Sequence, residues 1–200
     1  MTALSSRYVR FAGMRRHLVV YFFLSLTGVL FAQATSLPAD IDWLPGMQSK
    51  ETFSASGLTR AEQQQVLKQV QDTSFDVPEA WLAELRVRSI SLGSAAGLAV
   101  RGTKLLCGGT GNCQQWIFRR ENSRWLNMFE SQAPVVSGVG LVRQATAIKD
   151  LVVTANLSAE RESWIRYRFD GTFYRRTECY QVDRGATGGR AQRTACPGGG

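Results

Sequence analysis

The sequence predicts an α+β fold, with an N-terminal helix packed on a mainly antiparallel β-sheet of consecutive hairpins. One stretch near residue 60 has helical periodicity and a helix start signal. Residues 86–182 instead carry short apolar runs separated by glycines and turn residues, as in sheets of short strands. The dipeptide Asp170-Gly171 stands between two such runs and is among the strongest short-range hairpin signals.

The helix is expected to begin after Thr59. Thr59 and Glu62 have the spacing of a capping box, in which each side chain accepts a hydrogen bond from the other residue's backbone N–H. An apolar stripe continues through Gln71, and Pro78 is expected to start a second helical segment over residues 78–85.

A hairpin is expected after a glycine-rich loop. Trp116 and Phe118 alternate with Ile117, so the first two should face one side of the sheet and the third the other. In the next strand, Trp125 and Phe129 are expected to lie in phase.

The loop before this hairpin, bracketed by Cys107 and Cys113, predicts a disulfide-stapled turn. Its three glycines let the backbone bend, and the short loop limits the stabilisation to about 2–3 kcal/mol. A phosphate-binding loop fits the sequence less well than a stapled turn does. The next expected element is a strand, and no Lys-Ser/Thr pair follows the glycines. Cys179 is expected to be free or loosely tied to Cys196.

Seven further apolar runs complete the predicted sheet. The sequence leaves open whether Tyr167 faces Tyr174, since this requires a two-residue turn at Asp170-Gly171 and a three-residue turn would shift the register. The runs cover residues 86–92, 97–101, 135–136, 139–142, 151–155, 164–169 and 173–182.

The ends of the chain differ from its centre. Arg15-Arg16 precedes an apolar run and an Ala-x-Ala pattern, so residues 1–34 are expected to be a signal peptide cleaved after Ala34. Met14, directly before the arginines, is an alternative start to Met1. Residues 35–57 are expected to be an extended or disordered lead in which Trp43 docks, residues 58–182 a single domain, and residues 183–200 a disordered tail.

Export predicts a periplasmic or extracellular protein, with structural cysteines and no membrane insertion after cleavage. Of the net charge of +8, the four arginines of residues 1–34 contribute +4 and residues 181–200 contribute +2. The remaining +2 over residues 35–180 does not suit nucleic-acid binding.

The sequence offers few catalytic groups, so we expect a non-enzymatic protein with no cofactor and no metal. The single histidine, His17, lies in the signal peptide, and no cysteine pair has C-x-x-C spacing. The alternative is a hydrolase of envelope polymer that uses the carboxylates of Asp150, Glu160 and Glu162.

Arginines interleaved with aromatic residues form the main candidate binding surface. If they share one sheet face, they could bind an envelope glycan or a partner protein, since arginine stacks on aromatic rings and pairs with anions. The same pattern also fits a sheet with one buried and one solvated face. The candidates are Trp116, Arg119, Arg120, Arg124, Trp164, Arg166, Arg168 and Arg175.

Three blocks carry a resemblance to a family: CGGTGNCQQWIFRR, IKDLVV and YRFDGTFYRRTECY. Over about residues 58–180 the chain resembles an uncharacterised family of exported bacterial proteins with a C-G-x-x-G-N-C-x-x-W block and a closing Y-R-F-D-G block. The resemblance implies a bacterial envelope or extracellular origin and no particular activity. Cys107, Cys113 and Cys179 fall on its pattern, and Cys196 does not.

We predict that the exported protein begins at Thr35, because signal peptidase cleaves after Ala-x-Ala patterns. N-terminal sequencing of protein from the cell envelope measures this directly. Retention of residues 18–31 would contradict it and would make the protein membrane-anchored.

Overall fold

The computed structural model describes residues 37–47, 49–74, 79–103, 106–144, 146–185 and 190–197. The chain divides into two units, Met1–Ala32 and Gln33–Gly200, and all described residues belong to the second. The predicted signal peptide and its cleavage site lie outside the described residues. Among the described residues, neither helix has the length and apolar character that crossing a membrane requires.

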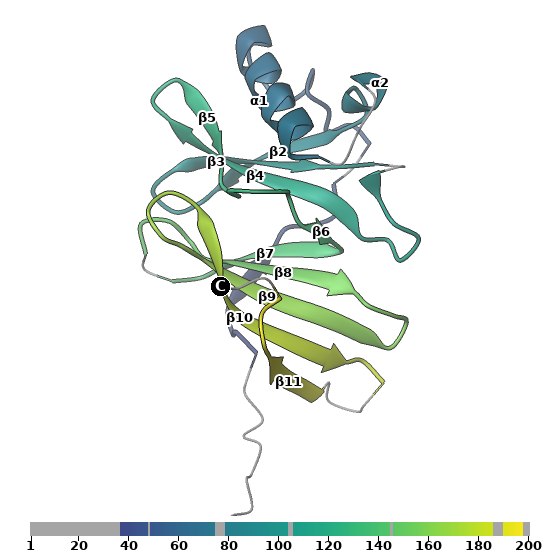
Figure 1. The fold of residues 1–200 in the computed structure, drawn as a ribbon. Helices are drawn as coiled ribbons and strands as arrows, with labels where there is room; N and C mark the ends of the chain where they lie inside the picture. The colour runs from purple at the N-terminus through teal and green to yellow at the C-terminus, as the bar shows by residue number, and fades with distance from the viewer. Residues whose placement is uncertain are drawn as a thin grey trace, which may run out of the picture. The chain divides into compact units, whose positions relative to one another are not determined.

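The structure is mostly antiparallel β-sheet with one main helix, as predicted, but the strands form two sheets instead of one (Figure 1). The six-stranded sheet has the order β1-β7-β8-β9-β10-β11. Its strands are β1 (Ile41–Trp43), β7 (Gly138–Val142), β8 (Leu151–Asn156), β9 (Arg161–Phe169), β10 (Tyr174–Asp183) and β11 (Arg190–Thr194).

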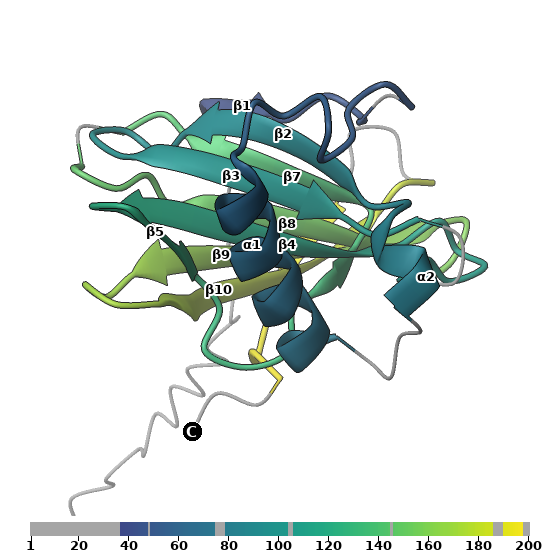
Figure 2. The same ribbon diagram turned by 90° about the horizontal axis from the view of Figure 1, so that it is seen from above.

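The second sheet has five strands, ordered β2-β3-β4-β5 with β6 paired to β4. One face of it carries α1 (Arg60–Thr73), which lies across the strands in Figure 2. Its strands are β2 (Arg86–Ser91), β3 (Ala96–Arg101), β4 (Cys113–Glu121), β5 (Arg124–Asn127) and β6 (Val135–Val136), and a short helix, α2 (Glu79–Leu82), precedes them.

Two hydrophobic cores lie on opposite faces of the five-stranded sheet. Trp116 and Phe118 face α1, while Ile117 faces the six-stranded sheet, as the alternation predicted. All three side chains are fully buried. A sheet buried on both faces needs a second cover besides the helix, and the six-stranded sheet supplies it.

The predicted phase of Trp125 and Phe129 is wrong. Trp125 packs in the core beneath α1, whereas Phe129 packs between the sheets. The reason is that β5 ends at Asn127, whose side-chain oxygen accepts a hydrogen bond from the Phe129 N–H at 3.2 Å and turns the chain.

The helix starts where the sequence placed it. Thr59 is the N-cap, its hydroxyl accepts from the Glu62 N–H, and the Glu62 carboxylate accepts from the Thr59 N–H. The backbone N–H of Thr59 holds the pKa of Glu62 below its usual range. However, α1 is not the N-terminal element, because part of the expected lead forms β1 and pairs with β7.

Both chain ends add an edge strand to the six-stranded sheet. Trp43 of β1 docks edge-to-face on Trp164, with ring centroids 5.2 Å apart. At the other edge, Arg190–Thr194 form β11 in the segment expected to be disordered. The Cys179–Cys196 disulfide ties this end to β10, which decides between the two states left open for these cysteines.

The predicted Cys107–Cys113 disulfide is confirmed. Beside it, the side chain of Asn112 pairs with the backbone of Asn156 through two hydrogen bonds of 2.8 Å, so the loop is fixed against the end of β8. The two disulfides fit an oxidising, exported environment.

The turn at Asp170-Gly171 gives neither of the two strand registers that the sequence left open, those of a two-residue and of a three-residue turn. Residues 170–173 form a four-residue connection, so Tyr174 pairs with Phe169, and Tyr167 pairs with Arg176. The Asp170 carboxylate accepts hydrogen bonds from the N–H groups of Thr172 and Phe173, both at 2.8 Å, which stabilises the longer turn.

We predict that Thr73→Val lowers the free energy of unfolding by about 1–3 kcal/mol, because it leaves a buried N–H without an acceptor. The Trp116 Nε1–H donates to the Thr73 hydroxyl at 2.9 Å, and the Trp116 side chain is fully buried. Thr73→Ser keeps the hydroxyl and should retain most of the stability in urea unfolding. Equal losses in both variants would contradict the prediction.

Candidate functional site

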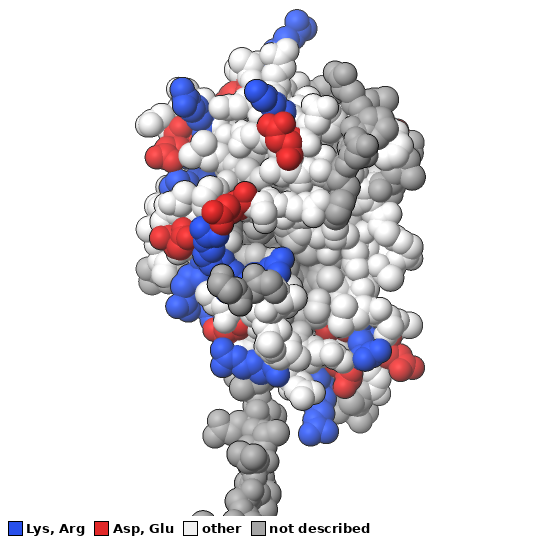
Figure 3. Space-filling model, viewed as in Figure 1, with Lys and Arg blue, Asp and Glu red and all other residues white. Residues whose placement is uncertain are grey.

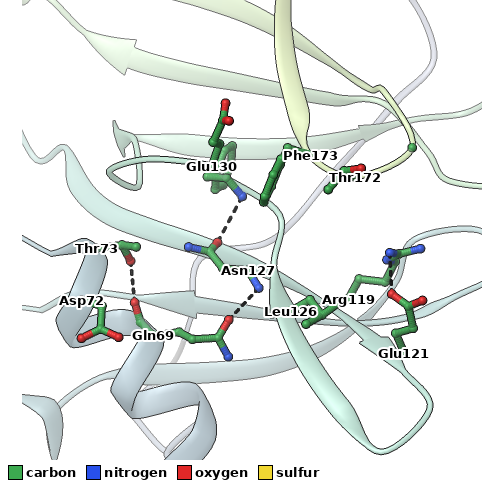
Figure 4. Close-up of a pocket in the computed structure, with 12 residues that line it drawn as sticks. Gln69, Asp72, Thr73, Arg119, Glu121, Leu126, Asn127, Glu130, Thr172 and Phe173 are labelled. Atoms are coloured by element: carbon green, nitrogen blue, oxygen red, sulfur yellow. Dashed lines mark hydrogen bonds and ion pairs between the residues drawn. The ribbon is translucent and has the colours of Figure 1, made fainter.

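The candidate site is a cleft of about 620 Å³ beside the C-terminal half of α1. We call it the hairpin cleft, because the β4–β5 hairpin and the β9–β10 turn form most of its walls (Figure 4). Its volume lies in the range of ligand-binding pockets. The lining residues are Gln69, Asp72 and Thr73 of α1, Arg119, Glu121, Leu126, Asn127, Phe129 and Glu130 around β4 and β5, and Gly171, Thr172 and Phe173 of the turn.

Glutamines of α1 fix one wall of the hairpin cleft. The Gln69 amide donates to the Trp125 carbonyl at 2.8 Å and accepts from the Asn127 N–H at 3.0 Å. Gln65 accepts from the Trp125 N–H at 3.1 Å. These bonds satisfy the backbone of edge strand β5, so the helix and the hairpin form one rigid wall.

The opposite wall is the β9–β10 turn, positioned by Asp170. Its two backbone hydrogen bonds hold the pKa of the Asp170 carboxyl below its usual range, and Arg175 donates to the same carboxylate at 2.8 Å. The Arg175 guanidinium also lies over the Phe173 ring at 5.6 Å and forms an ion pair with Glu130. The Phe173 ring is thereby held at the mouth of the cleft.

The floor of the hairpin cleft is apolar. Phe129 is buried beneath it, and Leu126 is 37% exposed. Arg119 stacks on Phe169 at 5.1 Å and forms a 2.9 Å ion pair with Glu121. An apolar floor with charged groups on the walls is typical of sites that bind amphipathic ligands.

Two buried donors in the cleft walls have no hydrogen-bond partner among the described residues. They are the Nε of Arg119 and the Nδ2 of Asn127. The Asn127 amide cannot turn to exchange its atoms, because its oxygen already accepts from the Phe129 N–H. Such donors are uncommon, and neighbouring atoms shield both of them from the cleft, so they do not identify a ligand.

The structure separates the arginines and aromatic residues of the predicted binding surface. Only Arg119 lines the hairpin cleft, and Arg175 borders it. Trp116 is fully buried under α1 and presents no surface. Arg120 pairs with Glu62 at 3.0 Å and lies over Trp125.

Three of these residues lie instead on the outer face of the six-stranded sheet. Trp164 contacts Trp43, and Arg166 donates to the buried Asp150 carboxylate at 2.8 Å and lies 3.5 Å from Glu178. Arg168 is exposed and lies 3.6 Å from Asp150. Arg124 is exposed at the start of β5. In Figure 3, basic and acidic side chains alternate over the visible face instead of gathering in a basic patch.

Asp150 and Glu162, two carboxylates of the hydrolase alternative, do not form a pair. Asp150 precedes β8 and is bound by Arg166, whereas Glu162 lies at the far end of the β8–β9 ladder, opposite Asn156. Six residue steps along the strand separate these positions by roughly 20 Å. Paired carboxylates in glycosidases lie within about 10 Å of each other. Glu160 is exposed in the turn before β9.

One residue of the cleft has a signal in the sequence. Asp72 stands in the last turn of α1, where the helix dipole disfavours an acid, and local conflicts of this kind are expected at functional or strained positions. Leu126 and Asn127 carried no such signal, since their place depends on the end of β5. In the described part of the chain, no cluster of three or more His, Cys, Asp or Glu side chains could hold a metal ion.

Comparison of the chain with protein-family models, with curated proteins and with solved structures finds no match. The geometry of the hairpin cleft is therefore the main evidence for what the protein does.

We predict that the Phe173 amide resonance titrates with a midpoint below 3.8, the ordinary pKa of an aspartate. Since the pKa of Asp170 is depressed in the folded protein, its carboxylate stabilises the turn above that value, and the contribution is lost as the pH falls through the folded pKa. Two-dimensional NMR between pH 6 and pH 2 measures the midpoint.

Asp170→Asn is the control, because asparagine keeps an acceptor oxygen and does not titrate. Its Phe173 resonance should show no transition in this range. A midpoint at or above 3.8 in the wild type would contradict the prediction.

Proposed function

We propose that this protein is an exported, non-enzymatic binding module whose ligand, a partner protein or another envelope component, occupies the hairpin cleft. The observation that carries the proposal is the cleft of about 620 Å³, with an apolar floor and two walls fixed by hydrogen bonds and ion pairs. Rigid walls reduce the conformational entropy that is lost on binding, so even a small site of this kind gains affinity for its ligand.

Several observations favour binding over catalysis at this site. The carboxylates at the cleft are Asp72, Glu121 and Glu130, and two of them are engaged in ion pairs with arginines. Histidine is the most common general acid or base at neutral pH, and the sequence has no histidine after residue 17.

We predict that Leu126→Ser weakens retention of the envelope ligand about fivefold, as expected when roughly 1 kcal/mol of apolar contact is lost. Immobilised protein is incubated with solubilised envelope fractions, and bound material is quantified. Leu157→Ser is the matched control, because Leu157 is also an exposed leucine, at 53%, and lies outside the hairpin cleft. Equal retention by both variants would contradict a ligand in the cleft.

The same fractions test the hydrolase alternative. Release of soluble fragments from envelope polymer by the wild type, lost in Glu160→Gln or Asp150→Asn, would overturn the non-enzymatic proposal. Circular dichroism of Asp150→Asn accompanies the assay, because this variant also loses the ion pair with Arg166.

A further inference from the structure

We propose that the hairpin cleft binds a peptide segment in which a basic side chain lies next to an apolar one. This inference rests on the proposed function and adds the chemical class of the ligand. Two properties of the cleft support it: its charge and its apolar floor.

The charge of the hairpin cleft favours a cation. Of the charged residues that line it, Arg119 pairs with Glu121, and Glu130 pairs with Arg175. Asp72 is exposed and has no ion-pair partner among the described residues. It also stands in the last turn of α1, which contains no basic residue, so the negative end of the helix dipole adds to its charge.

This placement costs helix stability, because an acid in the last turn opposes the dipole. Lys68 lies four residues earlier on the same helix face, but it forms no ion pair with Asp72 in the structure. A basic ligand group beside Asp72 would offset this cost, because it would pair with the carboxylate and interact favourably with the helix C-terminus. In Figure 4, Asp72 and Gln69 lie on the α1 side of the cleft, and Phe173 and Thr172 lie on the opposite side.

The floor selects an apolar neighbour for that basic group. Leu126 and Phe173 present apolar surface to the cleft above Phe129, so an aliphatic or aromatic side chain can pack there while the cation reaches Asp72. A neutral or acidic glycan lacks the cation, and a simple polyamine lacks the apolar branch. A peptide supplies both from neighbouring residues.

The test uses three blocked pentapeptides, Ac-Ala-Leu-X-Leu-Ala-NH2, in which X is lysine, norleucine or glutamate. Norleucine keeps the aliphatic stem of lysine and removes the charge. Calorimetric titration of the oxidised, exported protein should give the tightest binding for lysine, about two- to fivefold weaker binding for norleucine, as for an exposed ion pair, and the weakest binding for glutamate.

Asp72→Asn identifies the partner of the cation. In this variant the lysine and norleucine peptides should bind equally, with the norleucine affinity unchanged. Glu160→Gln is the control, since it removes an exposed carboxylate outside the hairpin cleft, and it should keep the preference for lysine. Raising the salt concentration should reduce the difference in affinity between the lysine and norleucine peptides for the wild type, because salt screens the ion pair.

Equal binding of the lysine and norleucine peptides to the wild type would overturn the inference, as would a lysine preference that survives Asp72→Asn. If none of the peptides binds but retention of envelope material still depends on Leu126, the peptide class is wrong and the binding function stands. If retention is also independent of Leu126, both proposals fail.

Discussion

The alternation of Trp116, Ile117 and Phe118 along β4 is the constraint on which the rest of the structure depends. Because neighbouring side chains leave a strand on opposite faces, three consecutive large apolar residues require apolar cover on both sides. The helix covers one face and the six-stranded sheet the other. Burial of these three residues stabilises the fold by several kcal/mol, since each contributes about 2 kcal/mol. The two cores therefore meet at β4, and the neighbouring strand β3 likewise contributes to both.

The hairpin cleft follows from how this layered arrangement ends. Met128 and Phe129, directly after Asn127, pack in the core between the sheets, so the chain crosses from one layer to the next beside the end of α1. The β9–β10 turn extends past the same point. A concave surface forms where the layers fail to cover one another, and its walls are stiff because each belongs to a hydrogen-bonded element.

Local signals were sufficient for the features that depend on neighbouring residues. The capping box, the Cys107–Cys113 disulfide and the alternation in β4 were each predicted from a few adjacent positions. The second sheet and the edge strands β1 and β11 were not, because their pairing depends on residues far apart in the chain. The hairpin cleft combines three such distant segments, so only Arg119 among its residues was predicted.

The Cys179–Cys196 disulfide makes the attachment of β11 to the six-stranded sheet depend on the redox state of the surrounding compartment. It covalently holds the segment that contains β11 against β10, and β11 occupies what would otherwise be an open strand edge. In a reducing cytosol this covalent link is absent, and β11 is held only by its short ladder. An oxidising compartment adds the link, so β11 is held most firmly as the edge strand where disulfides persist.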